Sequence, residues 1–394
     1  MALSKTIMTR WPFKAAAHCV GTLLVLSQAL VGQSAGFTFN RKAYNPAILT
    51  LGYTVDRGAA KSAAAAGAAS TPVDNAFVDI TLVTRDGEAI GRRVSVSSQR
   101  FSQELRELYG QLSKQESLDT SNPSSPSRQL YEALIAPVAD ELRARGVTTL
   151  LIAAERGLQG VPYAALHDGT AFLGERFAFS LTPSLQFTSL APPRQSAPEM
   201  LAAGASRFDG LAPLPLVPQE VGGAAHGNPS QTRLDKDFTP SVLLDQAGDP
   251  RYGRIHLATH ADFKPGGPSK SLLYTGTAPV PLSDFLRLRQ RRDRDVLDLF
   301  VLSACRTALG DSSSEMGFAG LALQAGARSA VGTLWYVDDV ATSAYFLQLY
   351  RYLDQGLPKA EALQATRVAF AQGLVQIKDD SMIGADGAVL LTRL

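Results

Sequence analysis

The chain of 394 residues contains very few cysteines, and this scarcity limits how its fold can be stabilised. Only Cys19 and Cys305 are present, so loss of the N-terminal segment would leave Cys305 alone. A lone cysteine excludes an intramolecular disulfide, and the fold must then rest on its hydrophobic core. A single thiol in an exported protein is also a candidate reactive group, although free cysteines are more often buried structural residues.

Charged residues and several enzyme signatures are also scarce. Charged residues make up 19% of the chain, and the formal net charge is only +2. This balance gives no bias toward nucleic acid or anionic membranes, so we expect no nucleic-acid partner. The chain lacks the P-loop and the dinucleotide-binding glycine fingerprint. What is present is an apolar content of 45%, which is enough for a substantial core.

The N-terminus has the pattern of an export signal. Lys5, Arg10 and Lys14 precede residues 15–31, which contain no Lys, Arg, Asp or Glu. Small residues at 27–29 and 34–36 offer cleavage sites. The apolar run is short for a membrane span, which needs about 20 residues. We therefore expect a signal peptide over residues 1–35 and a periplasmic or secreted protein. An uncleaved membrane anchor, the only expected membrane contact, and an ordinary N-terminal helix are the alternatives.

The remaining chain divides into four expected segments. Residues 36–72 should form a low-complexity linker, because they contain an Ala/Gly/Ser tract with little apolar surface to bury. Residues 73–127 should hold a β-hairpin and then a helix with apolar residues at three- and four-residue steps. This region either is a small prodomain or completes the sheet of the next domain. Residues 128–375 should form the main domain, and residues 376–394 a C-terminal tail.

Two stretches of the main domain read as buried strands that end in small or polar residues. Leu299–Leu302 is a continuous apolar run followed by Ser303–Thr307 (SACRT), and Arg254–His260 (RIHLATH) ends at a histidine. Continuous apolar runs are typical of parallel strands buried on both faces. The carboxyl ends of such strands are where open α/β sheets build their sites. Neighbouring strands would therefore bring Cys305 and His260 to one edge of a sheet.

A Cys305–His260 pair has the chemistry of a nucleophile and its base. The thiolate is the reactive form, and an adjacent imidazole can lower the thiol pKa or take its proton. His256 lies about 13 Å from His260 along an extended strand, too far to share a metal ion, so we expect a packed strand histidine and no metal. We expect His167 at a surface turn and His226 in a loop.

Three motifs in order resemble the CHAT domain, a caspase-like module related to separase and other caspase-fold cysteine peptidases. They are His256–His260 (HLATH), Leu302–Thr307 (LSACRT) and Gly326–Asp339 (GARSAVGTLWYVDD). The resemblance covers roughly residues 127–373. It implies an α/β, caspase-like three-layer sandwich, with a mostly parallel sheet and helices on both faces. It also implies a cysteine endopeptidase that works through a thioester, or alternatively a catalytically silent interaction module.

The resemblance implies further site residues. The backbone N–H groups of Cys305 and Ala261 would hold the oxyanion, although the family usually has glycine where Ala261 stands. Asp262, Asp338 and Asp339 could form a pocket that favours Arg or Lys, or the last two could instead cap the following helix. No third catalytic residue can be named, and no cofactor is expected. The expected partner is a polypeptide substrate or a regulatory protein.

Overall fold

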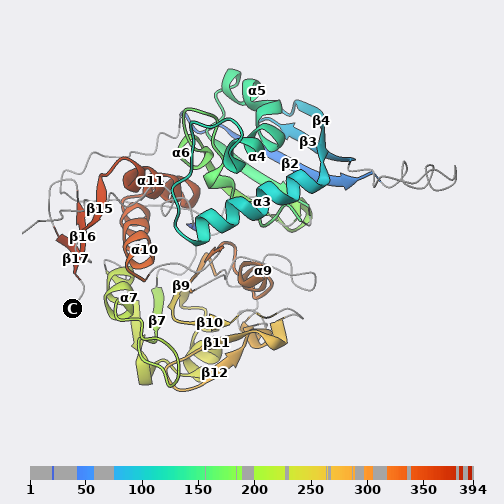
Figure 1. Ribbon diagram of the computed structural model, residues 1–394. Coiled ribbons are helices and arrows are strands. Elements are labelled where there is room, and N and C mark those ends of the chain that lie inside the picture. The colour runs from blue at the N-terminus through green and yellow to red at the C-terminus, as the bar shows by residue number, and fades with distance from the viewer. Residues whose placement is uncertain are drawn as a thin grey trace, which may run out of the picture.

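The computed structural model describes most of the chain between residues 42 and 392. The described residues are 20–21, 42–56, 75–155, 157–182, 184–188, 199–226, 230–262, 264, 268–285, 287–288, 297–304, 317–334, 339–378, 381–384 and 389–392. They form two larger and two smaller β-sheets with helices packed around them (Figure 1). Within these ranges no helix combines the length and the apolar character needed to cross a membrane. Most of the expected signal peptide lies outside them.

The first larger sheet contains five strands in the order β4-β3-β2-β5-β6. These strands are β2 (Pro46–Val55), β3 (Asn75–Val83), β4 (Ala89–Ser97), β5 (Thr149–Ala154) and β6 (Ala178–Thr182). The predicted hairpin is confirmed, because β3 and β4 pair antiparallel. β3 also runs antiparallel to β2, whereas β2, β5 and β6 are parallel. The strands that precede residue 127 therefore complete the sheet of β5 and β6.

Strand β2 corrects the expected linker over residues 36–72. Its residues Ala47, Leu49 and Leu51 are buried at alternate positions, as in a strand with one face on the core. The pattern is weak in sequence because Thr50 and Gly52 interrupt the apolar run. The partners of β2 are residues 75–83 and 149–154, which are distant in the chain, so local periodicity could not show that this strand lies at the centre of a sheet.

Helices cover the first sheet. They are α3 (Ser98–Ser113), α4 (Pro126–Leu134), the 3-10 turn η1 (Ala136–Val138) and α5 (Ala139–Ala144). The predicted helix after the hairpin is confirmed, and its residues Phe101, Leu108 and Leu112 are buried. Pro137 separates α4 from α5, because proline lacks the N–H that a continuous helix would use.

The second larger sheet carries the candidate site. Its order is β1-β14-β13-β9-β7-β8. The strands are β1 (Val20–Gly21), β7 (Glu199–Gly204), β8 (Ser230–Leu234), β9 (Tyr252–Ala258), β13 (Leu299–Ser303) and β14 (Ala330–Thr333). Every pair of neighbouring strands is parallel except the pair β1–β14, which is antiparallel. The sheet is therefore mostly parallel, as expected.

Both faces of this sheet are covered. Alternate strand residues pack into different clusters, with Met200 and Ala202 on one side and Leu201 and Ala203 on the other. The first face holds α7 (Val217–Ala225), α10 (Asp339–Asp354) and α11 (Lys359–Ala371). The second holds the π-helix η5 (Val242–Gln246), α9 (Gly317–Gln324) and a small antiparallel sheet of β10 (Ala261–Asp262), β11 (Leu272–Tyr274) and β12 (Pro279–Pro281). This arrangement is the expected three-layer α/β sandwich.

Helices α10 and α11 connect the two larger sheets. In Figure 1 they lie at the side of the molecule, with β2, β3 and β4 above and α7 and β7 below. α11 contacts β6 and α6 (Leu173–Arg176) of the first half, and α10 contacts β13 of the second. The other short helices are η2 (Tyr163–Ala165), η3 (Leu185–Phe187), η4 (Asp235–Asp237), η6 (Pro268–Lys270) and η7 (Leu282–Phe285).

The C-terminal segment is more ordered than the expected tail. A three-stranded antiparallel sheet contains β15 (Val375–Lys378), β16 (Ser381–Gly384) and β17 (Val389–Thr392). Val375 and Met382 are buried in the cluster that also contains α10 and α11. Residues 376–394 therefore include strands, and their apolar residues add to the core.

Candidate active site

Strands β9 and β13 are parallel neighbours, and this pairing brings their ends, Ala258 and Ser303, to one edge of the sheet. The register runs from Arg254 opposite Leu299 to Ala258 opposite Ser303. Beyond it, the Thr259 N–H donates to the Ser303 carbonyl over 3.1 Å. His260 follows Ala258 by two residues, and Cys305 follows Ser303 by two residues. Cys305 itself lies outside the described residues.

The chain leading to Cys305 is held firmly up to Ala304. All five residues of β13 are buried, and Ala304 is 6% exposed. The Thr333 hydroxyl on β14 donates to the Ala304 carbonyl. Because Thr333 is completely buried, this bond lies in a protected environment. Both neighbours of β13 therefore hold the last described residues of this segment, Ser303 and Ala304.

The imidazole of His260 is held by the loop between β7 and α7. Its Nε2 lies 2.8 Å from the carbonyl oxygen of Ala212, and the ring of Phe208 packs against it with centroids 4.7 Å apart. A carbonyl oxygen only accepts hydrogen bonds, so Nε2 carries the hydrogen. In the neutral ring Nδ1 is then the nitrogen with a free lone pair. His260 can therefore accept a proton at Nδ1 while Ala212 fixes its orientation.

The backbone around His260 is fixed by the small sheet. The Tyr274 N–H donates to the His260 carbonyl over 3.0 Å, and the Thr259 hydroxyl donates to the Tyr274 carbonyl. Ala261 follows as the first residue of β10, opposite Leu273 of β11. It is partly buried and packs against the core on this face of the large sheet. Strand pairing thus holds both His260 and Ala261.

The model of the CHAT domain family matches residues 124–381. The chain belongs to the CHAT family. The match covers more than half of the chain and includes both candidate catalytic positions. It supports the caspase-like assignment of the fold. The observed three-layer sandwich also agrees with the architecture expected for this family. No curated protein matches the chain in a sequence search.

Two of the three aspartates of the expected CHAT specificity pocket are described, and their surroundings differ. Asp262 forms an exposed ion pair with Lys264, with 2.8 Å between oxygen and nitrogen, and this carboxylate raises the pKa of the lysine. Asp339 begins α10, and its carboxylate accepts from the Leu216 N–H at the start of α7 over 3.2 Å. Asp338 lies outside the described residues. The two described carboxylates therefore each have a partner within the protein.

His256 is confirmed as a packed strand histidine. It is completely buried, with Nε2 3.0 Å from a Glu220 oxygen and Nδ1 3.1 Å from the Tyr350 hydroxyl. The Ser343 hydroxyl donates to the other Glu220 oxygen over 2.6 Å. Since the carboxylate only accepts, Nε2 donates to it, and in the neutral ring Nδ1 accepts from the tyrosine. Among the described residues, no group of three or more histidines, cysteines or acids could hold a metal ion.

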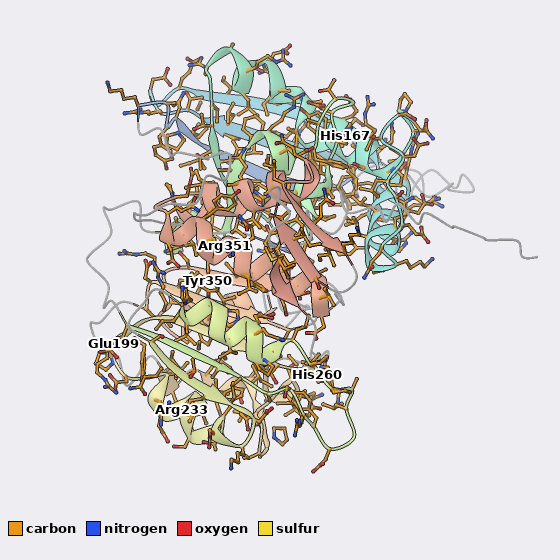
Figure 2. The ribbon with its side chains drawn as sticks, turned by 90° about the vertical axis from the view of Figure 1, so that its left-hand side faces the viewer. His167, Glu199, Arg233, His260, Tyr350 and Arg351 are labelled. Carbon is orange, nitrogen blue, oxygen red and sulfur yellow. The ribbon has the colours of Figure 1, made fainter. Side chains whose placement is uncertain are left out.

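Of the two remaining described histidines, His167 lies away from this site. Figure 2 shows His167 in the other half of the molecule from His260. His167 was expected at the surface, but it is only 6% exposed, and burial lowers its pKa. Its Nδ1 accepts from the Gly169 N–H and its ring packs edge-on against Phe172, so the turn folds over it. His226 is exposed at the end of α7.

Sequence reasoning missed two contacts, one to His260 and one to His256. Ala212 acts through its backbone carbonyl, which any residue at that position would supply, so no side-chain pattern could reveal it. Glu220 could not be paired with its buried partner His256, because the two residues are 36 positions apart. Both contacts depend on the folded loop and helix that follow β7.

Proposed function

We propose that the protein is a cysteine endopeptidase in which Cys305 is the nucleophile and His260 manages the protons. The observation that carries this proposal is the parallel pairing of β9 and β13, because it brings the ends of these strands, Ala258 and Ser303, to the same edge of the sheet. His260 and Cys305 each follow two residues later in the sequence. The described hydrogen bond of His260 supports it, since Ala212 leaves Nδ1 available as a base. Polypeptide is therefore the proposed substrate, with no metal or cofactor in the reaction.

The proposed reaction proceeds in two steps. The Cys305 thiol gives its proton to His260 Nδ1, and the thiolate attacks the peptide carbonyl carbon. The C–N bond breaks, the departing amine takes the proton from His260, and a thioester remains on Cys305. Water then attacks the thioester with His260 as base, and the thiol leaves with the proton. The Ala212 carbonyl favours the imidazolium formed in each step, because it accepts a hydrogen bond from Nε2.

The oxyanion of each step would be held by the backbone N–H groups of Cys305 and Ala261. Such fixed donors are typically worth about 3 kcal/mol each in transition-state stabilisation. Pairing of β10 with β11 gives Ala261 a fixed backbone, which supports this role. For specificity, we propose a preference for Arg or Lys through Asp262, Asp338 and Asp339. The Asp262–Lys264 pair is exposed, and exposed pairs are weak enough for a substrate cation to displace.

A catalytically silent CHAT module is the second candidate. It is favoured by the alanine at position 261, where the family usually has glycine. A Cβ restricts the backbone conformations that glycine would allow next to the oxyanion. In this alternative the same sheet edge would bind a protein partner without cleaving it. Export through the N-terminal segment is proposed for either candidate.

Cleavage of a peptide mixture tests the enzyme proposal. The purified protein and its Cys305→Ala variant are incubated with a pool of diverse peptides, and the products are identified by mass spectrometry. Cleavages made only by the wild type, preferentially after Arg or Lys, would support a cysteine peptidase with an acidic pocket. Identical product patterns would favour the silent module. An Asp262→Asn variant that keeps the same preference would remove Asp262 from the pocket.

A further inference from the structure

The loop between β7 and α7 carries both groups that contact the His260 side chain. Phe208 provides the packing ring and Ala212 provides the hydrogen-bonded carbonyl. The loop closes on itself where the Leu214 N–H donates to the Ser206 carbonyl over 2.9 Å. Ser206 is therefore the near end of the loop, two residues after β7 ends at Gly204. Whatever fixes Ser206 also limits the movement of Phe208 and Ala212.

Asp235 fixes Ser206 through its carboxylate. One oxygen accepts from the Ser206 backbone N–H at 2.7 Å and from the hydroxyl at 2.9 Å, while the other oxygen lies 3.1 Å from the hydroxyl. Asp235 follows directly after β8, where Leu234 is in register with Gly204. The carboxylate thus satisfies both donors of Ser206, which is 6% exposed. Hydrogen bonds to a charged acceptor at a buried site are among the stronger ones in proteins.

The backbone of Asp235 is left-handed and closely packed. Its φ angle is +46°, a conformation that aspartate and asparagine adopt more often than other residues with a Cβ. The Asp235 carbonyl accepts from the Phe238 N–H, and a Cβ added at Gly276 would lie only 1.8 Å from the Asp235 carbonyl oxygen. Gly276 is therefore needed for this approach.

The close contact between Asp235 and Gly276 also connects Asp235 to the segment that holds the His260 backbone. Gly276 donates its N–H to the Phe238 carbonyl over 2.8 Å, and it lies two residues after Tyr274. Tyr274 donates to the His260 carbonyl. Asp235 therefore touches two segments that hold His260: the loop that contacts the imidazole and the end of the strand that pairs with the His260 backbone. None of the contacts involves Cys305.

We propose that Asp235 is a positioning residue that keeps the His260 imidazole in the Nε2–H form by fixing the loop through Ser206. Its effect on the histidine follows from contacts between described residues. Its effect on catalysis rests on the proposed function, because it matters only if His260 is the base. The alternative is a purely structural role, in which Asp235 stabilises the fold without changing the state of His260.

Nitrogen NMR of the histidine side chains distinguishes these roles. Protein labelled with ¹⁵N-histidine is compared as wild type, Asp235→Gly and Asp235→Asn. Glycine and asparagine both tolerate the left-handed backbone, so the substitutions remove the carboxylate without new strain. Asp237→Gly is the matched control, because Asp237 lies in the same turn, η4, and is exposed. His256, fixed by Glu220 and Tyr350, serves as an internal reference.

The expected result is a single Nε2–H tautomer for His260 in the wild type and in Asp237→Gly. In Asp235→Gly the His260 signals should move to the average of two tautomers, while those of His256 stay unchanged. Asp235→Asn should fall between, because one acceptor oxygen remains. If Asp235→Gly does not fold, Asp235→Asn alone decides the outcome. Wild-type signals for His260 in a folded Asp235 variant would overturn the proposal.

Kinetics then separate this inference from the proposed enzyme. If the wild type cleaves peptides, Asp235→Gly should lower kcat roughly 10- to 100-fold with little change in KM, as misplacement of a catalytic group does. An unchanged kcat would show that Asp235 does not position the base. If the wild type cleaves nothing but the His260 signals respond as expected, the positioning role stands and the peptidase proposal fails.

Discussion

At the level of single residues, buried polar contacts hold helices α7 and α10 against strand β9 of the second sheet. Glu220 on α7 binds His256 on β9 and Ser343 on α10, and His256 also binds Tyr350 on α10. These four side chains are almost completely buried. Buried polar groups are costly unless every partner is present, so the four residues fix how two helices and a strand fit together.

Removing the Glu220 carboxylate, which is at the centre of this network, should destabilise the folded protein. We expect Glu220→Ala to lower the free energy of unfolding by about 3 kcal/mol, because it leaves buried donors on His256 and Ser343 without an acceptor. Tyr350→Phe removes only one donor and keeps the ring, so it should cost about 1 kcal/mol. Urea unfolding measures both values. Losses below about 0.5 kcal/mol for both variants would show that the network does not stabilise the fold.

Lys359 predicts a pH dependence of stability. Its ammonium group donates to the Asp298 carbonyl and carboxylate and to the Ser329 hydroxyl, and burial lowers its pKa from 10.5 to about 8. Between these two values the unfolded chain binds the proton and the folded protein does not. Stability from this group should therefore rise as the pH increases from about 8 to 10.5, by up to about 3 kcal/mol.

A Lys359→Met variant isolates this contribution. The difference in urea-unfolding free energy between wild type and variant is measured at several pH values. This difference should be constant below about pH 8 and should shift in favour of the wild type above it. The comparison cancels the titration of the buried tyrosines, which is common to both proteins. A difference that stays constant through this window would contradict the lowered pKa.

At the level of elements, the packing of α7 against α10 gives a matched pair of substitutions. A Cβ at Gly223 would lie 2.0 Å from a methyl carbon of Leu347 on α10, whereas a Cβ at the adjacent Gly222 would meet nothing within 4 Å. Gly222→Ala should stabilise the protein by up to about 1 kcal/mol, since alanine favours helix. Gly223→Ala should destabilise it by about 1 kcal/mol, because the overpacking cost exceeds that gain. Thermal unfolding measures both, and equal effects would show that α10 can shift freely.

The strands and helices that could be predicted from sequence are those with strong local patterns. β9, β13 and α3 each have continuous or periodic apolar residues. The predicted bounds of β9 and β13 agree with the structure within about two residues, and α3 follows the hairpin as predicted. β2 could not be predicted because Thr50 and Gly52 interrupt its apolar run and its partners are distant. Two contacts around His260 could not be predicted either. Ala212 acts through its backbone carbonyl, and Asp235 acts through a contact to the loop at Ser206, and neither contact has a sequence motif.

At the level of the whole molecule, the first sheet depends on strands outside the span matched by the family model. The match begins at residue 124, but β2, β3 and β4 precede it. β2 pairs directly with β5, β3 pairs with β2, and β4 pairs with β3. Leu49, Leu51, Val78 and Ile80 are buried in the same core as Leu150 and Ile152. The matched segment therefore lacks part of its own hydrophobic core when these strands are removed.

A shortened chain tests this dependence. Protein beginning at residue 124 should aggregate or lack a cooperative unfolding transition, because β5 would have an open edge and its core would be exposed. Protein beginning at residue 42 keeps all strands of the first sheet and is the control. Size-exclusion chromatography and thermal unfolding compare the two. A monomeric, cooperatively unfolding protein from residue 124 would show that the first sheet does not need these strands.

The reactivity of Cys305 tests the central claim, the functional pairing of Cys305 with His260. In a Cys19→Ser background Cys305 is the only thiol, so its alkylation by iodoacetamide can be followed from acidic to alkaline pH. The proposal predicts rapid alkylation well below the ordinary thiol pKa of about 8.5 and a shift of the profile to higher pH in His260→Ala. Slow alkylation with the same pH profile in both proteins would contradict the pairing.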